Sequence, residues 1–398
     1  YQTYFYLLLS IAARHCNTSF HIVKGYYVYL LRLTSQTLTD NMYATTILEH
    51  QTMEEVTTAS RKDDHIRINI EQDVQFKSIS NGLEKLYFNH KALPELDLDG
   101  INTNTTILGK NLRIPLLISC MTGGTAKAGR VNRMLAEAAQ SAGVSLGLGS
   151  MRVALEDLDS VSSFQVRDIA PDILLFANIG AVQLNYGVTI DDCRRLVELS
   201  GADGLVLHFN PLQESLQHEG QTNFSGLLDQ VKTLCEALDR DGVCVVAKEV
   251  GWGFSEETCR NLADVGVSAI DVAGAGGTSW SQVEMYRSSD DSEKRVSSVF
   301  ADWGIPTVDA IVNARQGAPK VTCIASGGLR NGVEVAKCLC LGASMTGMAH
   351  PFLQAAMHST DRILSTIMEI ERQLRISMFC SGASNISDLQ QISLLSRK

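Results

Sequence analysis

Short apolar runs alternate with segments of helical periodicity over most of the chain. The runs are typical of strands buried on both faces, whereas the segments between them place apolar residues three and four positions apart, as helices do. The strands are predicted at residues 115–119, 144–148, 173–178, 204–209, 243–248, 269–272, 321–325 and 344–348. The helices are predicted at residues 131–142, 191–199, 224–238, 256–265, 308–314 and 332–341 and over much of 352–379.

Strands alternating with helices in this order predict an α/β fold, a (β/α)8 TIM barrel with an N-terminal extension. A doubly wound open sheet is the competing fold, but it predicts one glycine-rich turn after the first strand. Glycine-rich turns follow several strands here, which favours the barrel. Residues 151–168 are expected to be irregular, and the polar, serine-rich residues 287–301 to form an insertion or mobile loop. Asp191, Ser225 and Ser255 are the predicted N-caps.

The residues after each strand are the candidates for chemistry, because in a barrel those loops build the active site. The stretch His208-Phe209-Asn210-Pro211-Leu212-Gln213-Glu214 follows a buried run, and Pro211 halts the strand. A single polar turn of this kind is usually a surface loop. Polar or glycine-rich residues follow all of the other predicted strands too, and such recurrence is hard to ascribe to chance. They include Met121, Thr122, Ser150, Arg152, Asn178, Lys248, Thr278, Gly327, Gly328 and Ala349.

Two of these turns occupy the usual phosphate-binding position of barrels, after the seventh and eighth strands. Gly327-Gly328 is the first, and Gly347-Met348-Ala349 is the second. Glycine allows backbone amides to approach a phosphate closely. A phosphate there would leave the rest of a cofactor across the barrel mouth. Lys248 is then informative, because a lysine at a strand end costs desolvation unless an anion or a polar ring edge compensates it.

The composition and charge of the chain limit the kinds of partner and the cellular setting that we expect. The chain has 398 residues, of which 45% are hydrophobic, and a net charge of -10. No basic patch interleaved with aromatics is present, so nucleic acid is not expected as a partner. The ten cysteines lack C-x-x-C spacing, which predicts free thiols in a reducing, cytoplasmic setting and no zinc site.

The N-terminal segment differs from the rest of the chain. Residues 1–55 contain two apolar patches, both too short to span a bilayer, so no membrane association is expected. We predict an unstructured leader there, with a targeting role as the alternative, and a barrel domain with an N-terminal substrate-binding arm at residues 56–398.

Taken together, the motifs resemble the type 2 isopentenyl-diphosphate Δ-isomerases, which are FMN-dependent. The resemblance extends roughly from Arg61 to Ser384. Its specific parts are the seven residues 208–214, called the heptad below, and Gly277-Thr278-Ser279-Trp280. The other motifs are Arg61-Lys62-x-x-His65, Ala92-Leu93-Pro94-Glu95, Met121-Thr122-Gly123-Gly124, Gly149-Ser150-x-Arg152, Lys248-Glu249-Val250-Gly251 and Ser326-Gly327-Gly328-x-Arg330.

The resemblance implies the interconversion of isopentenyl and dimethylallyl diphosphate in isoprenoid biosynthesis, with reduced FMN, Mg²⁺ and NADPH as the reductant. It implies catalytic roles for Gln213 and His208, and a Mg²⁺ ligand in Glu214. FMN would be bound by Met121, Thr122, Ser150, Asn178, Lys248, Thr278, Gly327, Gly328 and Ala349. The substrate would be bound by Arg61, Lys62, His65, Arg152, His208, Asn210 and Gln213, with Ser150 also placed near its diphosphate.

The chemistry of the residues agrees with these roles. A diphosphate requires Arg and Lys side chains and a hard cation, and one carboxylate with phosphate oxygens is a usual way to bind Mg²⁺. Moving a double bond requires protonation of one carbon and deprotonation of its neighbour. No pair of acidic residues flanks the hydrocarbon end, so reduced flavin is the acid–base candidate and Gln213 an orienting group. We hypothesise that Arg61, Lys62 and His65 reach a neighbouring subunit's site in a homo-oligomer, a tetramer or octamer.

Three alternatives use the same barrel. A 2-hydroxy-acid oxidase should show a His-Gly-x-Arg strand end, and none is present. A relative of inosine-monophosphate dehydrogenase would need a nucleophilic Cys in a glycine-rich loop, which Gly276-Gly277-Thr278 lacks. A non-enzymatic flavin-binding or phosphosugar-binding barrel gives no reason for a heptad that combines metal-binding and diphosphate-binding groups.

Overall fold

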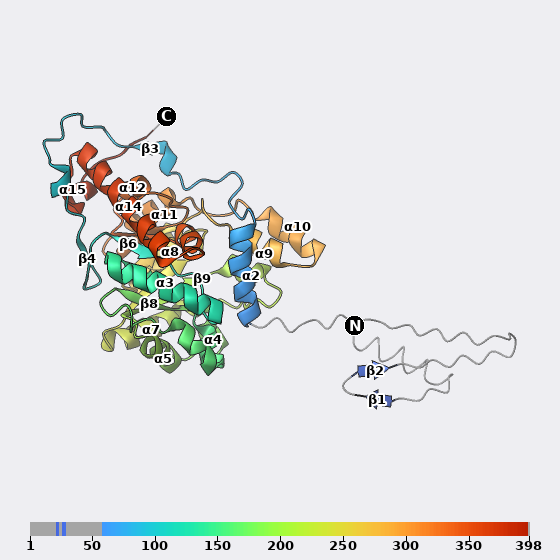
Figure 1. Ribbon diagram of the computed structural model, residues 1–398. Coiled ribbons are helices and arrows are strands. Elements are labelled where there is room, and N and C mark those ends of the chain that lie inside the picture. The colour runs from blue at the N-terminus through green and yellow to red at the C-terminus, as the bar shows by residue number, and fades with distance from the viewer. Residues whose placement is uncertain (1–20, 24–25, 29–57, 397–398) are drawn as a thin grey trace, which may run out of the picture. The chain divides into compact units, whose positions relative to one another are not determined.

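A computed structural model describes residues 21–23, 26–28 and 58–396 of the chain (Figure 1). The chain divides into two compact units, Tyr1–Glu54 and Glu55–Lys398. In the first unit, β1 (His21–Val23) pairs antiparallel with β2 (Tyr26–Val28). Apart from these two strands, the predicted leader lies outside the described residues.

The second unit contains a closed barrel of eight parallel strands, in the spatial order β6 to β13 with β13 beside β6. The predicted TIM barrel is therefore confirmed, and every predicted strand is present in order. The strands are β6 (Leu116–Ile118), β7 (Ser145–Gly147), β8 (Leu175–Gly180), β9 (Gly204–Phe209), β10 (Cys244–Glu249), β11 (Ala269–Asp271), β12 (Thr322–Ser326) and β13 (Met345–Met348).

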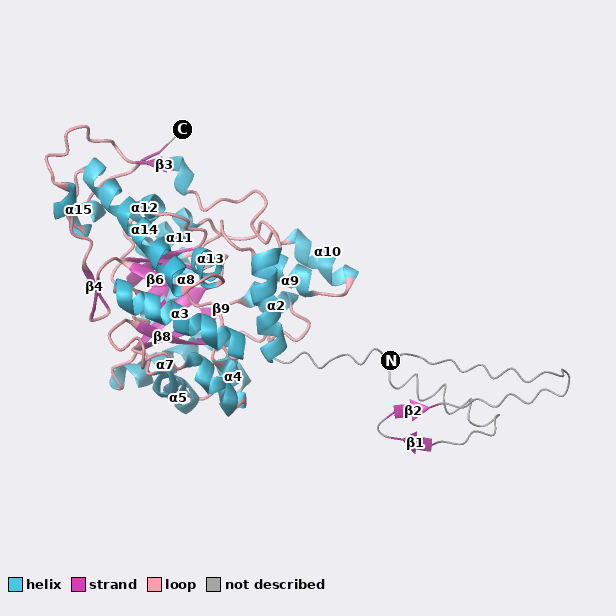
Figure 2. Cartoon of the chain, in the orientation of Figure 1, coloured by secondary structure: helices cyan, strands magenta, loops and turns pink. Residues whose placement is uncertain are grey.

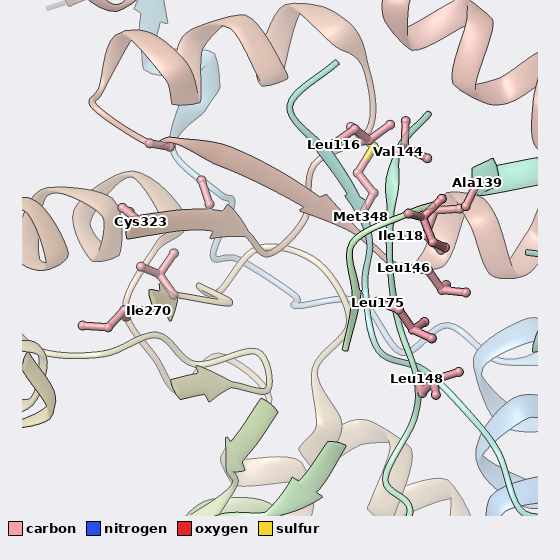
Figure 3. Close-up of a cluster of buried hydrophobic side chains, with 14 of the residues drawn as sticks. Leu116, Ile118, Ala139, Val144, Leu146, Leu148, Leu175, Ile270, Cys323 and Met348 are labelled. Atoms are coloured by element: carbon pink, nitrogen blue, oxygen red, sulfur yellow. The ribbon is translucent and has the colours of Figure 1, made fainter. Parts of the chain in front are cut away.

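Side chains alternate along each strand between the barrel interior and the surrounding helices. Leu117, Phe176 and Val206 belong to the interior cluster. Leu116 and Ile118, on either side of Leu117, belong instead to the cluster packed under the helices (Figure 3). This alternation decides which strand-end residues face the barrel mouth.

A hairpin of β4 (Thr105–Ile107) and β5 (Lys110–Leu112) packs against the same interior cluster. Asp203, immediately before β9, lies 2.9 Å from Lys110 Nζ and 2.9 Å from Arg167 Nη2. This ion cluster therefore lies at the amino ends of the strands, opposite the barrel mouth.

Helices surround the strands, as Figure 2 shows for α3, α5, α7 and α8. Each predicted helix is present, although the span 352–379 is divided into two. The helices that follow the strands are α3 (Ala126–Ala142), α4 (Arg152–Glu156), η3 (Leu158–Phe164), η4 (Ala181–Tyr186), α5 (Ile190–Ser200), α6 (Pro211–Leu216), α7 (Leu227–Arg240), α8 (Glu256–Asp264), α9 (Trp280–Arg287), α10 (Asp291–Val299), α11 (Thr307–Gly317), α12 (Gly332–Cys340), α13 (His350–Ala356) and α14 (Thr360–Ser381).

Two segments predicted to be irregular contain helices. Residues 287–301 form the predicted insertion between β11 and α11, but they contain the helix α10, at whose start the Asp290 side chain accepts two backbone N–H groups. Residues 151–168 contain α4 and the 3-10 helix η3.

Of the three predicted N-caps, only Ser255 is confirmed. The cap of α5 is Thr189 rather than Asp191, because Thr189 and Asp192 form a reciprocal capping box. The residue before α7 is Gly226, in a left-handed conformation, rather than Ser225.

The N-terminal arm is the helix α2 (Thr58–Glu71), which lies beside α9 (Figure 1). Outside the barrel, η1 (Leu83–Lys85), η2 (Leu98–Gly100) and α15 (Ile386–Gln390) are short, and β3 (Leu86–Tyr87) pairs with β14 (Leu395–Ser396). In the described part of the chain, no helix has the length and apolar character needed to cross a bilayer.

Candidate active site

A cavity of about 870 Å³ lies at the carboxyl ends of the barrel strands. Its floor is polar because several strands carry a polar residue or glycine two positions beyond an interior apolar residue. The pair Val206 and His208 shows the pattern, as does the pair Val246 and Lys248. The floor residues of this kind are Ser119, Asn178, His208, Lys248, Ser326 and Gly347.

All nine residues predicted to bind FMN line this one cavity. Thr122 is buried, and its Oγ1 has no hydrogen-bond partner among the described residues. A buried hydroxyl without a partner is costly, so its presence at a cavity wall indicates a ligand that would satisfy it. The Oγ atom of Ser119 is also buried and has no partner in the described part of the chain, and Ser119 was missed from the sequence.

The glycine turns after β11 and β12 pack against each other at the cavity wall. A Cβ added to Gly277 would lie 2.7 Å from the backbone N of Gly328. Gly328 has φ of +70°, and a Cβ there would collide with the carbonyl of Gly276. These positions therefore require glycine, and they expose backbone amides to any phosphate bound there.

The heptad forms the other side of the cavity. His208 Nδ1 lies 2.8 Å from Asn178 Oδ1, so the two predicted site residues from β8 and β9 contact each other. Pro211 begins α6, a position where its missing N–H costs nothing. Asn210 Nδ2 donates to Gln213 Oε1 at 3.1 Å and to Glu214 Oε1 at 2.9 Å, which fixes both side chains on the first turn.

The arm contributes to the cavity of its own chain. Lys62 and His65 line the cavity, and Lys62 Nζ donates to the Ser150 carbonyl at 2.6 Å. Two backbone hydrogen bonds, Ser279 N to Val74 O at 2.7 Å and Phe76 N to Gly277 O at 3.3 Å, fasten the arm to the loop after β11. In the single chain, Lys62 and His65 thus lie at the cavity of their own barrel, and their hypothesised reach into a neighbouring subunit's site stays a prediction.

Two other predicted substrate residues are placed differently. Arg152 lines the cavity from α4, and its guanidinium donates to Glu156 Oε1 at 2.9 Å and Gln221 Oε1 at 3.2 Å. The backbone of Arg61 belongs to α2, but its side chain lies outside the described part of the structure.

Glu284 of α9 is a buried carboxylate that contacts several side chains at once, and it was not predicted from the sequence. Its Oε1 accepts from Gln213 Nε2 at 2.9 Å and Gln217 Nε2 at 2.8 Å, and lies 3.3 Å from His65 Nε2. Its Oε2 accepts from Arg287 Nε at 2.9 Å. Burial opposes ionisation of this carboxyl, but His65, Arg287 and Gln213 outweigh burial and hold its pKa at about 2. Glu284 therefore fixes the Gln213 amide, although it is not itself among the cavity-lining residues.

A second buried carboxylate lies under the floor. Asp271, at the end of β11, is 1% exposed, and its Oδ2 lies 3.1 Å from Lys248 Nζ. Its Oδ1 accepts from Ser326 Oγ at 2.5 Å. Strand alternation places Asp271 on the interior side, two positions after Ala269, but no sequence pattern marks its pairing with Lys248.

Glu249 holds the loop after β10. Its Oε2 accepts the backbone N–H groups of residues 250, 251, 252 and 253, and Val250 and Gly251 line the cavity. Burial raises the pKa of this carboxyl to about 7, although the four N–H groups favour its ionised form.

Cys120 lines the cavity next to Met121. Burial raises the pKa of its thiol to about 11, although Lys248 and Asn178 act in the opposite direction. The thiol is therefore neutral at physiological pH and a poor nucleophile.

The described residues contain no group of three or more His, Cys, Asp and Glu side chains that could hold a metal ion. Glu214 lines the cavity, with Oε1 accepting from Asn210 and Oε2 accepting from the backbone N of Gln221 at 2.7 Å. A single carboxylate of this kind suits a hard cation only where a ligand supplies further oxygens.

Comparisons with known proteins agree with this architecture. The family model for FMN-dependent dehydrogenases matches residues 210–396. A solved structure of a mandelate oxidase with (S)-mandelic acid superposes with a TM-score of 0.60, at 16% identity, over 85% of this chain and 94% of that one. At such low identity the likeness shows the shared barrel fold alone. The fold thus defines the chain as a (β/α)8 barrel, of which residues 210–396 match the model for FMN-dependent dehydrogenases.

Relatives of higher sequence identity define the family of the chain more narrowly than the fold does. An isopentenyl-diphosphate delta-isomerase from Nostoc is 47% identical over 346 residues, which are 87% of this chain and 98% of that protein. Proteins of the same name from Rickettsia canadensis and Synechocystis are 48% and 47% identical, over 83% and 86% of this chain and 95% and 97% of their own lengths. The chain belongs to the isopentenyl-diphosphate delta-isomerase family. The resemblance predicted from the sequence, and with it an enzyme of the isomerase class, is confirmed.

Proposed function

We propose that this enzyme interconverts isopentenyl and dimethylallyl diphosphate, with reduced FMN and Mg²⁺ bound in the cavity. One observation supports the proposal most strongly. The residues predicted to bind FMN and most of those predicted to bind the substrate line the same cavity of about 870 Å³. That volume lies at the upper end of the range for small-molecule and cofactor sites, as expected for a cofactor together with a small substrate. The membership in the isomerase family supports the same reaction.

The residues present fit a flavin. Thr122 Oγ1 lacks a partner within the described part of the chain, and Gly277, Gly327 and Gly328 keep side chains away from a wall of backbone amides. Thr122, Asn178, Lys248 and Thr278 would hold the ring, and the glycine turns and Ala349 would hold the phosphate. When bound, reduced FMN would supply the acid–base group that the side chains around the hydrocarbon end lack.

The chain's own residues bind and orient the substrate. Lys62, His65 and Arg152 would hold the diphosphate with Asn210, and Ser150 lies between this group and the flavin residues. Glu214 would bind Mg²⁺ jointly with diphosphate oxygens, because one carboxylate is too few ligands by itself. Gln213, fixed by Glu284 and Asn210, would orient the reacting carbons, and His208 would contact the substrate from the floor.

Three further features stay part of the proposal. NADPH would reduce the flavin, because the isomerisation itself consumes no electrons. The chain would act in the cytoplasm, since its many cysteines are unpaired in the described residues. It would assemble as a homo-oligomer, a tetramer or octamer.

The test is an anaerobic assay of isopentenyl diphosphate with FMN, NADPH and Mg²⁺, with dimethylallyl diphosphate measured by NMR. We expect Glu214→Gln to lower the Mg²⁺-dependent rate by about 10²-fold or more, because one ligand and its charge are lost. FMN affinity should stay unchanged. Glu198→Gln, an exposed change on α5, serves as the matched control. Absence of product when reduced flavin is demonstrably bound would exclude this function.

A further inference from the structure

Lys248 and Asp271 form a buried ion pair in the floor of the cavity. Lys248 is 8% exposed and lines the cavity, whereas Asp271 is 1% exposed and lies behind it. The lysine Nζ lies 3.1 Å from Asp271 Oδ2 and donates to the Glu249 carbonyl at 3.1 Å. An ammonium group has three N–H donors, and the Glu249 carbonyl accepts one of them, so at least one remains for an acceptor in the cavity beside the ion pair with Asp271.

Asp271 is held in place by its own partner. Ser326 Oγ, from the neighbouring strand β12, donates to Asp271 Oδ1 at 2.5 Å. The carboxylate therefore faces Lys248 with its other oxygen and has no access to a ligand. Its influence on the cavity passes through Lys248.

Of the ionisable groups around Lys248, Asp271 is the carboxylate that contacts its ammonium group. Glu249 follows it directly, but its Oε2 is occupied by four backbone N–H groups of the next loop. Cys120 is a neutral thiol at physiological pH, and His208 on the adjacent strand contacts Asn178. Asp271 is thus the carboxylate in direct contact with the ammonium. Buried lysines without such a partner lose their proton readily.

We propose that Asp271 is a positioning residue that holds the Lys248 ammonium in the cavity floor and directs one N–H toward the bound flavin, so that the pair sets the flavin's reduction potential. This inference rests on the proposed binding of FMN. A cation beside the ring stabilises the negative charge that the flavin gains on reduction. Asp271 thereby controls the flavin without touching it.

The test compares Asp271→Asn with Asp203→Asn. Asp203 is the matched control, because it loses contacts of similar length to Lys110 and Arg167 at the opposite end of the barrel. The first measurement is competitive amine labelling of Lys248 in the flavin-free protein across pH, read by mass spectrometry. The second is the midpoint potential of the FMN-loaded protein from about pH 6 to about pH 9.

In Asp271→Asn, Lys248 should become reactive at a lower pH than in the wild type, because a buried ammonium without a counter-ion releases its proton more readily. The potential should exceed the wild-type value below that pH, where the cation is uncompensated, and fall under it above that pH, where the cation is lost. Asp203→Asn should match the wild type in both measurements. An unchanged labelling profile and an unchanged potential in Asp271→Asn would overturn the inference.

A variant that fails to fold still gives a result. If Asp271→Asn does not fold, the double variant Lys248→Met/Asp271→Asn should fold, because it also removes the unpaired ammonium. Failure of the double variant beside a folded Lys248→Met would overturn the proposal. The labelling needs no flavin, so wild-type protein that binds no FMN would contradict the proposed function while the Lys248–Asp271 pairing is still tested.

Discussion

Replacing Glu284 by glutamine would test how the Gln213 side of the site is held. The carboxyl has an ordinary pKa of 4.5 and a pKa of about 2 in the folded protein. That difference corresponds to roughly 3 kcal/mol of preference for the ionised form in the folded state. Glu284 is 2% exposed, so solvent screening does not reduce this value. A glutamine could still accept one of the hydrogen bonds, so we expect a loss of about 2 to 3 kcal/mol.

Counting the hydrogen bonds of Glu284 gives a similar loss of unfolding free energy for Glu284→Gln. Glu284 accepts from Gln213, Gln217 and Arg287, whereas a glutamine offers one carbonyl oxygen and must direct its NH2 group at one set of donors. Losing one or two bonds to a charged acceptor costs about 1.5 to 3 kcal/mol each, partly recovered by the lower cost of burying an amide.

The dependence on pH has a defined sign. Because the folded-state pKa lies below the unfolded value, the stabilisation by Glu284 is present above about pH 4.5 and is lost as pH falls through about 2. The difference in unfolding free energy between the wild type and Glu284→Gln should therefore shrink by roughly 2 kcal/mol, to about 1 kcal/mol or less, near pH 3. Urea unfolding followed by circular dichroism measures it at each pH.

Activity supplies the second measurement. Gln213 loses a fixed acceptor, so kcat should fall by about 10²-fold, as expected when a catalytic group is misplaced. FMN affinity should not change, because Lys248 and Thr122 have no contact with Glu284. Glu256→Gln, which removes an exposed i,i+4 pair with Arg260, should change stability by less than about 0.5 kcal/mol. Equal stability of Glu284→Gln and wild type at neutral pH would refute the reasoning.

Three further predictions follow from single contacts. Gly328→Ala should weaken FMN binding by about 10-fold or more in a fluorescence titration, because its φ of +70° and the Gly276 carbonyl leave no room for a Cβ; unchanged affinity would place the phosphate elsewhere. Lys62→Met should raise KM for the diphosphate by about 10-fold with little change in kcat, and a loss confined to kcat would contradict its binding role. Alkylation of Cys120 in the native protein should be slow at neutral pH and accelerate toward the pKa of about 11; rapid labelling at pH 7, followed by peptide mapping, would argue against a buried thiol.

The barrel could be predicted because its signals are local. Apolar runs and helical periodicity recur in strict alternation, and the closed sheet has the predicted strands in the predicted order. The mouth residues were predictable for the same reason, since each follows a strand within a few positions. Thus Lys248 and Asn178 needed only the strand boundaries to be placed on one surface.

The rest depended on contacts between distant segments. Asp271 and Glu284 sit in an apolar strand and a short helix, where nothing nearby marks them as partners of Lys248 and Gln213. The segment after α2 is joined to the loop after β11 by two backbone hydrogen bonds, in which Val74 O accepts from Ser279 N and Phe76 N donates to Gly277 O. In these cases pairing across the fold, rather than local pattern, decided the outcome. The helix α10 is the exception, because its Asp290 cap is a local contact.

The arrangement of charges explains how an acidic chain can hold anionic ligands. With a net charge of -10, the overall field would repel a diphosphate, and salt screens that field within about 10 Å. Glu214 lines the cavity as the proposed Mg²⁺ ligand, whereas the carboxylates of Asp271 and Glu284 lie behind the cavity surface and contact groups that face it. Lys248 and Gln213 are consequently held with N–H groups at or near the cavity, while their partners stay out of contact with a ligand. These two buried carboxylates therefore strengthen anion binding instead of opposing it, because each orients a donor that the ligand meets first.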